Sequence, residues 1–316
     1  MIEYRSFRNY DPPGLLHLWQ AAGLGRGAAV NRSNEESLDY VNYAQQYFDA
    51  AGLILAVDGV VPVGFVHAGF GCRPDGSGLN TKSGVIYSII VRPDYRRQGI
   101  GRELLRRAER YLHNAGAETI DAGPAPKRDL FYHGLYGGAR PAGFLESDAA
   151  AAPFFQSLRY TPVEKYSVTE RAVLDRDPVN FRLTKIRRHW ELAIVDQPDP
   201  CTWYWMVRYG RLEGLYCVLV PRKGGMPIAG LTLIGLERYI GTWEDNTIGL
   251  TDLHVDETHR GQGFGQALIL DVIKRLRQES ISRATANVNV EDKAGLSVFR
   301  SAGFTPVDQG VVYRLT

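Results

Sequence analysis

Cysteine is scarce in this sequence, because its 316 residues include only Cys72, Cys201 and Cys217. Three widely spaced cysteines suit neither a disulfide framework nor a thiolate metal cage, so we expect no metal. No apolar run approaches the roughly 20 residues that span a bilayer. The first residues, MIEYRSFRNYDPP, carry acids and prolines where a secretory signal needs an apolar core. We therefore expect a cytoplasmic protein without a membrane partner.

An excess of charge of either sign is also missing. Lys and Arg number 37 and Asp and Glu 35, a net charge of +2. This balance provides no electrostatic surface for nucleic acid, so we expect no such partner. The 44% hydrophobic and 23% charged residues are typical of a globular protein. At roughly 100–200 residues per domain, the length suggests two domains, and nothing in it indicates an oligomeric state.

The chain contains an internal repeat. VRPDYRRQGIGRELL begins at Val91 and VDETHRGQGFGQALI begins at Val255, with Arg, Gln, Gly and Gly in one register. The matched pairs, each 164 residues apart, are Arg96 and Arg260, Gln98 and Gln262, Gly99 and Gly263, and Gly101 and Gly265. Such self-similarity indicates a duplicated structural unit.

A second pair of blocks supports the duplication. FFQSLRYTPV ends at Val163 and VFRSAGFTPV ends at Val307, 144 residues later. Because this spacing is shorter than 164, the first copy carries about 20 extra residues, which we place in the Gly/Ala/Pro-rich stretch 124–153. Charged residues and Pro178 interrupt the apolar pattern near residues 171–180. We therefore predict domains at 1–175 and 176–316.

Each repeated motif has the pattern of a strand, a turn and an amphipathic helix. The apolar, β-branched run 85–91 predicts a buried strand that ends before Pro93. After the glycines, apolar residues recur at helical spacing on one face. They are Ile100, Leu104, Leu105, Ala108 and Leu112, followed in the second copy by Phe264, Leu268, Ile269, Val272 and Leu276. Further predicted strands flank turns at Asp58–Gly59 and 223–225, and a helix is predicted over 37–51. The fold class is mixed α/β.

The Arg-x-x-Gly-x-Gly turn is suited to binding an anion. A turn that opens a helix offers unpaired N–H groups at the positive end of the helix dipole. Gly99 and Gly101 allow the backbone to approach an anion closely, and Arg96, Arg97 and Arg260 add charged donors. A pyrophosphate fits this chemistry, while a solvated helix cap is the simpler alternative. The Gly-x-Gly-x-x-Gly of dinucleotide folds and the Gly-Lys-Ser/Thr of phosphate loops are both missing.

In these motifs, and in the closing Phe-x-x-x-Gly-Phe at 299–304, the sequence resembles the GNAT acyltransferase superfamily, as a tandem protein of two such domains. The resemblance implies that both turns bind the pyrophosphate of acetyl-CoA. It also implies that the strands ending at Val91 and Val255 splay from their neighbours and pair with the pantetheine arm. An amine of a small molecule or peptide then attacks the thioester directly. The implied cofactor residues are Val91, Arg96, Arg97, Gln98, Gly99, Ile100, Gly101, Val255, Arg260, Gly261, Gln262, Gly263, Phe264, Gly265 and Phe299.

The sequence departs from the family pattern in the last helix of each copy. The family often has a tyrosine there that protonates the leaving thiolate, but this chain has Phe155 and Phe299. The first copy has Arg159 where the second keeps the helix-stopping Gly303, and Asp292 replaces a frequent asparagine.

Three residues are candidates for catalysis. Asp252, on the strand before the second turn, could take a proton from an ammonium group through water, or could be a salt-bridged acid. His254 shares its face if the strand is regular, although a lone histidine is more often structural. Tyr87 could donate a proton in the first half, although a tyrosine among Ile and Val is usually core.

Two aromatic segments allow two interpretations each. Trp203, Tyr204, Trp205 and Tyr209 either line an acceptor pocket or pack in the core and between domains. The Gly-rich stretch with Phe131, Tyr132, Tyr136 and Phe144 is either a substrate-covering loop or a spacer.

The resemblance and the residues together predict an acetyl-CoA-dependent N-acetyltransferase. The alternative is an acyl-CoA-binding sensing or interaction module in which one or both halves are inactive, and a nucleotide-binding oxidoreductase is a third hypothesis. The second copy keeps Gly303 and an uninterrupted strand-to-helix connection. We therefore predict that the second half is the principal site.

Overall fold

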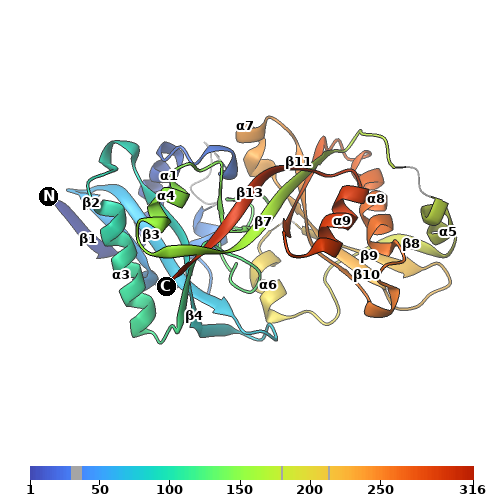
Figure 1. The fold of residues 1–316 in the computed structure, drawn as a ribbon, viewed down its shortest axis with the longest axis horizontal. Coiled ribbons are helices and arrows are strands. Elements are labelled where there is room, and N and C mark those ends of the chain that lie inside the picture. The colour runs from blue at the N-terminus through green and yellow to red at the C-terminus, as the bar shows by residue number, and fades with distance from the viewer. Residues whose placement is uncertain (30–37, 179–180, 213) are drawn as a thin grey trace.

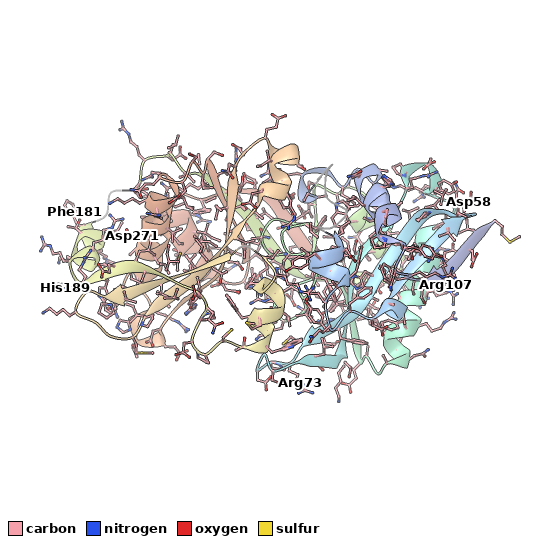
Figure 2. All side chains as sticks on the ribbon, turned by 180° about the vertical axis from the view of Figure 1, so that it is seen from behind. Asp58, Arg73, Arg107, Phe181, His189 and Asp271 are labelled. Carbon is pink, nitrogen blue, oxygen red and sulfur yellow. The ribbon has the colours of Figure 1, made fainter. Side chains whose placement is uncertain are left out.

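The computed structural model describes residues 1–29, 38–178, 181–212 and 214–316. Within these ranges, thirteen strands form one mixed sheet that runs through two halves lying side by side along the long axis (Figure 1). Side chains fill the molecule from Asp58 and Arg107 in the first half to Phe181 and His189 at the far end of the second (Figure 2). The predicted α/β class with two tandem units is confirmed.

The two halves contain corresponding elements. The strands of the first half are β1 (Ile2–Ser6), β2 (Leu53–Asp58), β3 (Val61–Cys72), β4 (Leu79–Val91), β5 (Thr119–Ala122), β6 (Phe144–Leu145) and β7 (Tyr160–Ala172), and its helices are α1 (Pro12–Ala21), α3 (Ile100–Asn114) and α4 (Ala151–Gln156). The strands of the second half are β8 (Trp190–Val195), β9 (Gly214–Pro221), β10 (Ala229–Gly235), β11 (Thr247–Val255), β12 (Arg283–Asn289) and β13 (Thr305–Leu315). Its helices are α5 (Phe181–His189), α6 (Trp203–Tyr209), α7 (Ile240–Trp243), α8 (Phe264–Leu276) and α9 (Lys293–Ser301).

The sheet order is β1-β2-β3-β4-β5-β13-β7-β12-β11-β10-β9-β8. The last strand of each half therefore lies beside β5 or β12 of the other half, since β13 pairs with β5 and β7 pairs with β12. β7 and β13 also pair with each other, antiparallel, from Thr305 opposite Glu170 to Leu315 opposite Tyr160. The boundary at 175 stays a prediction, because these two strands contribute to both halves.

The helix after each turn buries the predicted face. On α3 the buried residues are the predicted Ile100, Leu104, Leu105, Ala108 and Leu112. The five predicted residues of α8 are buried too, but so are Gln266 and Leu270 on its other sides. The reason is that α8 is covered by α5 and α9 as well as by the sheet, and Arg187 on α5 donates to Asp271 on α8 at 2.7 Å.

The helix predicted over 37–51 is wrong for the described part of that stretch. One helical turn covers Asp39–Tyr43, and a second covers Ala50–Gly52 after an irregular connection. Phe48 packs edge-on against Phe7 at 5.3 Å, and Tyr43 lies 5.2 Å from Phe7. A regular helix would not bring both rings to Phe7, so tertiary packing outweighs local propensity here.

The extra residues of the first copy interrupt a single strand. β5 ends at Ala122 and β6 begins at Phe144, and both pair with β13. The corresponding strand β12 continues without a break from Arg283 to Asn289. We call residues 123–143 the insertion loop. Apart from Gly123, it lies within the stretch 124–153, where the two repeat spacings place the surplus.

Candidate functional site

The two Arg/Gly turns have the same construction. A short helical turn, Pro93–Tyr95 or Glu257–His259, precedes each one. A left-handed glycine then starts the long helix, with φ +84° at Gly99 and +93° at Gly263. Such φ values favour glycine, which explains why both copies have a glycine just before the first residue of the helix.

The arginine and glutamine side chains of the turns donate to carbonyls of their own strand and turn, and Arg96 Nη2 also donates to the Ala22 carbonyl at the end of α1. Arg96 Nε donates to the Val91 carbonyl at 3.0 Å, and Arg260 Nε donates to the Val255 carbonyl at 3.1 Å. Gln98 and Gln262 also donate to backbone carbonyls within their turns, at 3.2 and 3.0 Å. These residues therefore fold the turn, which leaves the backbone to meet a ligand.

The backbone N–H groups are available for an anion. Those of Gly99, Ile100 and Gly101 have no acceptor among the described residues, and the same holds for Gly263, Phe264 and Gly265. A Cβ at Gly99 would meet no atom within 4 Å, so the approach is open. Unpaired N–H groups at a helix N-terminus bind phosphate groups without further charge.

The next glycine of each turn allows close packing of helices. A Cβ at Gly101 would lie 3.0 Å from the Phe154 ring on α4, and one at Gly265 would lie 3.4 Å from Val298 on α9. Phe154 and Val298 occupy corresponding positions of the repeat. The contact is tighter in the first half.

The strand before each turn separates from its parallel neighbour, as predicted. β4 pairs with β5 only from Ser83 to Ile86, and β11 pairs with β12 only from Thr247 to Gly249. Beyond these residues, β4 and β11 keep pairing only with β3 and β10. Among the described residues, each half therefore has a wedge beside the turn in which β4 or β11 no longer forms a ladder with its parallel neighbour.

In the first half, the insertion loop fills the face of the wedge opposite α3. Phe131 packs against His67 at 4.5 Å and Tyr87 at 4.8 Å, and Tyr132 stacks on Trp19 at 5.5 Å. The Tyr87 hydroxyl donates to the Phe70 carbonyl at 2.8 Å, and burial raises its pKa well above the usual value. The structure therefore favours the core interpretation of Tyr87.

In the second half, Asp252 lies at a bulge of β11, where the register to β10 shifts between Gly230 and Thr232. Its carboxylate accepts from Arg208 Nη2 at 2.7 Å, from the Tyr209 hydroxyl at 3.0 Å and from Arg140. Burial alone would raise the pKa of Asp252, but the charges of Arg140 and Arg208 outweigh it and hold that pKa well below the usual range. This environment favours the salt-bridged alternative over a proton acceptor.

His254 is exposed beside the same wedge. Its Nδ1 lies 3.2 Å from the Asp252 carbonyl, and its Nε2 lies 3.2 Å from the Tyr216 hydroxyl. A ring with its proton on Nδ1 satisfies both contacts, since Nδ1–H then donates to the carbonyl and Nε2 accepts from the hydroxyl. Burial raises the pKa of Tyr216 to about 12, so its hydroxyl stays protonated as a donor.

The two phenylalanines that replace the family's tyrosine are buried. Phe299 contacts Phe304 edge-on at 5.2 Å. Phe155 lies among Phe144, Tyr160 and Tyr313 at 4.7 to 5.5 Å. Asp292 caps α9 by accepting from the Gly295 N–H at 2.8 Å.

Sequence reasoning missed the partners of Asp252 and His254. Arg140 is on the insertion loop and Arg208 on α6, whose Tyr204 and Tyr209 belong to the predicted aromatic cluster. That cluster packs between the halves, and the Tyr204 hydroxyl donates to Asp129 of the insertion loop. The sequence signal that could have pointed to this contact is Arg140, the charged residue of the Gly- and Ala-rich segment 137–143.

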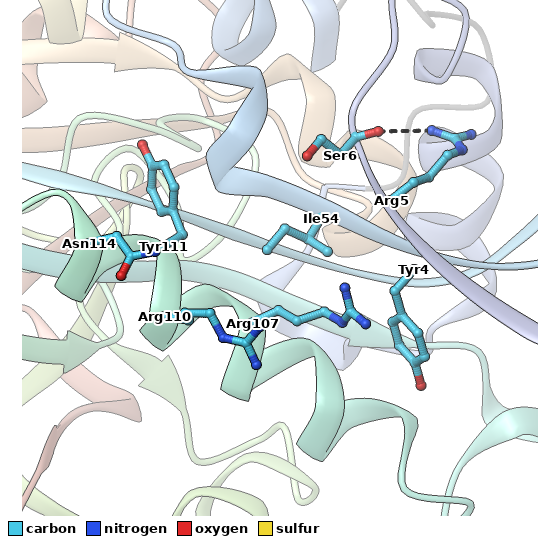
Figure 3. Close-up of a pocket in the computed structure, with 8 residues that line it drawn as sticks. All are labelled: Tyr4, Arg5, Ser6, Ile54, Arg107, Arg110, Tyr111 and Asn114. Carbon is cyan, nitrogen blue, oxygen red and sulfur yellow. Dashed lines mark hydrogen bonds between the residues drawn. The ribbon is translucent and has the colours of Figure 1, made fainter.

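A separate hollow of about 340 Å³ lies between β1, β2 and α3 and contains none of the predicted site residues (Figure 3). Arg5 is paired with Asp11 at 2.7 Å, and Arg107 is paired with Glu103 at 2.7 Å. Both arginines are therefore engaged by acids, and the hollow is a charged surface at the edge of the sheet. In the described ranges, no three His, Cys, Asp or Glu residues are grouped to hold a metal ion. No helix there is long and apolar enough to cross a membrane.

Comparison with known proteins gives one family, the acetyltransferase (GNAT) family, whose model matches residues 19–140 and again 183–304. A mycothiol acetyltransferase of Corynebacterium efficiens is 22% identical over 313 residues, covering 94% of this chain and 95% of the relative.

Solved structures show the same fold over the whole chain. A tandem GNAT protein from the clavulanic acid biosynthesis pathway has a TM-score of 0.69 at 18% identity, covering 99% of this chain and 98% of that one. The glucosamine N-acetyltransferase region of a fungal multi-domain β-N-acetylglucosaminidase has a TM-score of 0.72 at 16% identity. This chain is covered over 99% of its length in that match but spans only 38% of the fungal protein.

Proposed function

Because the chain belongs to the acetyltransferase (GNAT) family, we propose that it uses acetyl-CoA to N-acetylate a small-molecule amine, mainly in its second half. The observation that carries this proposal is the anion-binding turn beside a strand that has left its neighbour. Both features occur in each half. Buried aromatic side chains of the insertion loop fill the face beside Tyr87 in the first half. In the second half the insertion loop and α6 cover β11 as far as Asp252, whereas His254 beyond it is exposed.

The residues present fit acetyl-CoA. The N–H groups of 263–265 would hold its pyrophosphate, and the free backbone of β11 up to Val255 would pair with the pantetheine arm. When bound, acetyl-CoA supplies an acetyl group activated as a thioester. The amine nitrogen forms an amide with that acetyl group, and the CoA thiol is released.

We assign the proton from the attacking amine to His254 rather than to Asp252: the Tyr216 hydroxyl takes the amine proton and passes its own proton to Nε2, to which it already donates. The imidazole is exposed, whereas the Asp252 carboxylate is engaged by two arginines. The Tyr216 hydroxyl and the Asp252 carbonyl fix the ring orientation. Water protonates the leaving thiolate, because Phe299 offers no proton.

Amino sugars are the first acceptors to test. One match with a solved structure is a glucosamine N-acetyltransferase region. A balanced net charge of +2 provides no long-range field that would select a strongly charged acceptor.

The test has two parts. Acetyl-CoA and CoA should each raise the thermal midpoint by several degrees at 100-fold excess over Kd, whereas NAD should not. Release of CoA thiol is then followed with glucosamine, a polyamine, free amino acids and an N-terminal peptide. Turnover with at least one amine is expected. A midpoint shift without turnover on any acceptor would contradict the enzyme and favour an acyl-CoA-binding module.

Phe299→Tyr should raise turnover or leave it unchanged, with little effect on acetyl-CoA affinity. The new hydroxyl sits where a donor for the leaving thiolate is expected, and the edge of the ring already meets Phe304. Kinetics and thermal denaturation of Phe299→Tyr are compared with the matched variant Phe155→Tyr. Phe155 is packed on several rings, so that variant should lose about 1–3 kcal/mol without any gain in rate. Equal destabilisation of both variants would show that Phe299 is only a core residue.

A further inference from the structure

The insertion loop of the first half reaches β11 of the second half. We propose that Arg140 on this loop is a positioning residue for the second-half site, because it holds Asp252 and, through the Asp252 backbone, the imidazole of His254. This inference rests on the proposed function of the second half. It makes the first half a working part of that site without any chemistry of its own.

Arg140 lies between two carboxylates. Its Nε donates to Asp129 at 2.6 Å, its Nη1 donates to Asp252, and its Nη2 donates to the Tyr204 hydroxyl at 2.9 Å. Asp129 is fully buried and is on the same loop, so it fixes the direction of the guanidinium. Three directed contacts on one planar group leave it a single orientation.

Arg208 completes a neutral cluster of two acids and two bases. It contacts the other oxygen of Asp252 at 2.7 Å and lies 3.7 Å from Asp129. Its guanidinium also stacks over the Tyr204 and Tyr209 rings at 3.9 and 4.4 Å. Because Arg208 belongs to the second half, Arg140 is the contribution that depends on the insertion loop.

The contacts of Arg140 and Arg208 with the Asp252 carboxylate hold the Asp252 backbone in an unfavourable conformation. Asp252 has φ +54°, a left-handed conformation that is costly for a residue with a Cβ. This conformation produces the bulge and aims the Asp252 carbonyl at Nδ1 of His254. If the carboxylate were released, β11 could relax toward regular pairing and the imidazole would lose one of its two fixed contacts.

The loop is also tied to the strand on the other side of the wedge. Asn287 Nδ2 on β12 donates to the carbonyls of Gly137 and Arg140, at 2.7 and 2.6 Å. A cavity of about 10 Å³ remains between the loop, β11 and β12, with room for about one water molecule. The insertion loop therefore bridges β11 and β12 where they no longer pair.

The chain offers a matched control for a purely structural role. Arg128 is on the same loop, is similarly buried and also contacts two acids, Asp121 and Glu164, which are on strands of the first half. Asp121 also accepts from Arg314 on β13, so this cluster joins the two halves as well but does not contact β11. Replacing one arginine and one aspartate in the cluster around Arg140, or in the one around Arg128, leaves the net charge of that cluster unchanged. The test pair is Arg140→Met with Asp129→Asn, and the control pair is Arg128→Met with Asp121→Asn.

We expect the test pair to lower kcat at least tenfold while the KM for acetyl-CoA changes less than twofold. Hydrogen exchange of the amides in 250–255 should become at least tenfold faster, because local opening of the bulge becomes easier. The control pair should change neither quantity, at a similar loss of thermal midpoint. Arg140→Lys, with a single ammonium group in place of the guanidinium, should give an intermediate kcat. His254→Asn should give the lowest kcat of the series.

Equal kcat and equal exchange in test and control pairs would overturn the positioning role. A fall of kcat that simply follows the thermal midpoint in both pairs would also overturn it. Hydrogen exchange is measured on the free protein and does not depend on turnover. If the unmodified chain acetylates no amine, the proposed function fails, while unchanged exchange in the test pair would still separately refute the role of Arg140.

Discussion

Gly261→Glu is expected to abolish most acetyl transfer, whereas Arg97→Glu should leave turnover intact. The two positions correspond in the repeat and are both left-handed, with φ +74° at Gly261 and +64° at Arg97. Arg97 shows that a side chain fits there, and a Cβ at Gly261 would meet nothing within 4 Å. A carboxylate a few ångströms from a pyrophosphate costs about 1–4 kcal/mol per charge pair, so acetyl-CoA affinity should fall about tenfold or more in the altered half.

Calorimetry with acetyl-CoA, together with the amine assay, measures both effects. Gly261→Arg and Arg97→Gly are the controls, because each gives one turn the residue of the other without adding a negative charge. Both controls should keep activity. Loss of turnover in Arg97→Glu, with Gly261→Glu unaffected, would assign the chemistry to the first half instead.

Separating the chain at 175/176 should leave neither fragment able to unfold cooperatively on its own. Without β13, the first fragment exposes the edges of β5 and β7, and β13 contributes the buried residues Val311, Val312 and Tyr313. At about 1.5–3 kcal/mol for each fully buried side chain, their loss is comparable with a whole-domain stability of about 5–15 kcal/mol.

Circular dichroism of fragments 1–175 and 176–316, alone and mixed, checks this expectation. An equimolar mixture should regain the thermal transition of the intact chain, and its acetyl-CoA binding should return with it. A cooperative transition in 176–316 alone, raised by acetyl-CoA, would show instead that the second half is an independent domain.

Local features of the fold could be predicted because local spacing encodes them. The five buried residues of α3 follow from helical periodicity. The sequence explains Gly99 by the approach of an anion, and the structure adds that Gly99 and Gly263 start their helices in a left-handed conformation. The repeat itself placed the surplus residues, since two spacings that differ by 20 leave one stretch to hold them. In these cases one segment carries the whole signal.

The exchange of strands and the cluster around Arg140 could not be predicted in this way. The alternation of β7 is the same whichever strand lies beside it, so its partner is decided only in the assembled sheet. Asp129, Arg140, Arg208 and Asp252 are far apart in sequence, and a surface ion pair would look the same at each position. The sequence allowed a salt-bridged Asp252, but it did not indicate that Arg140 and Arg208 would be its partners.

The reciprocal placement of β7 and β13 has a consequence for how such a chain can change over time. A single unit with this arrangement would have to borrow its missing strand from a second molecule and would depend on its concentration. In the duplicated chain the half that supplies the strand is covalently attached, so dilution cannot separate the two halves. A first half without activity of its own would therefore still be retained, because the second half cannot close its sheet without β7.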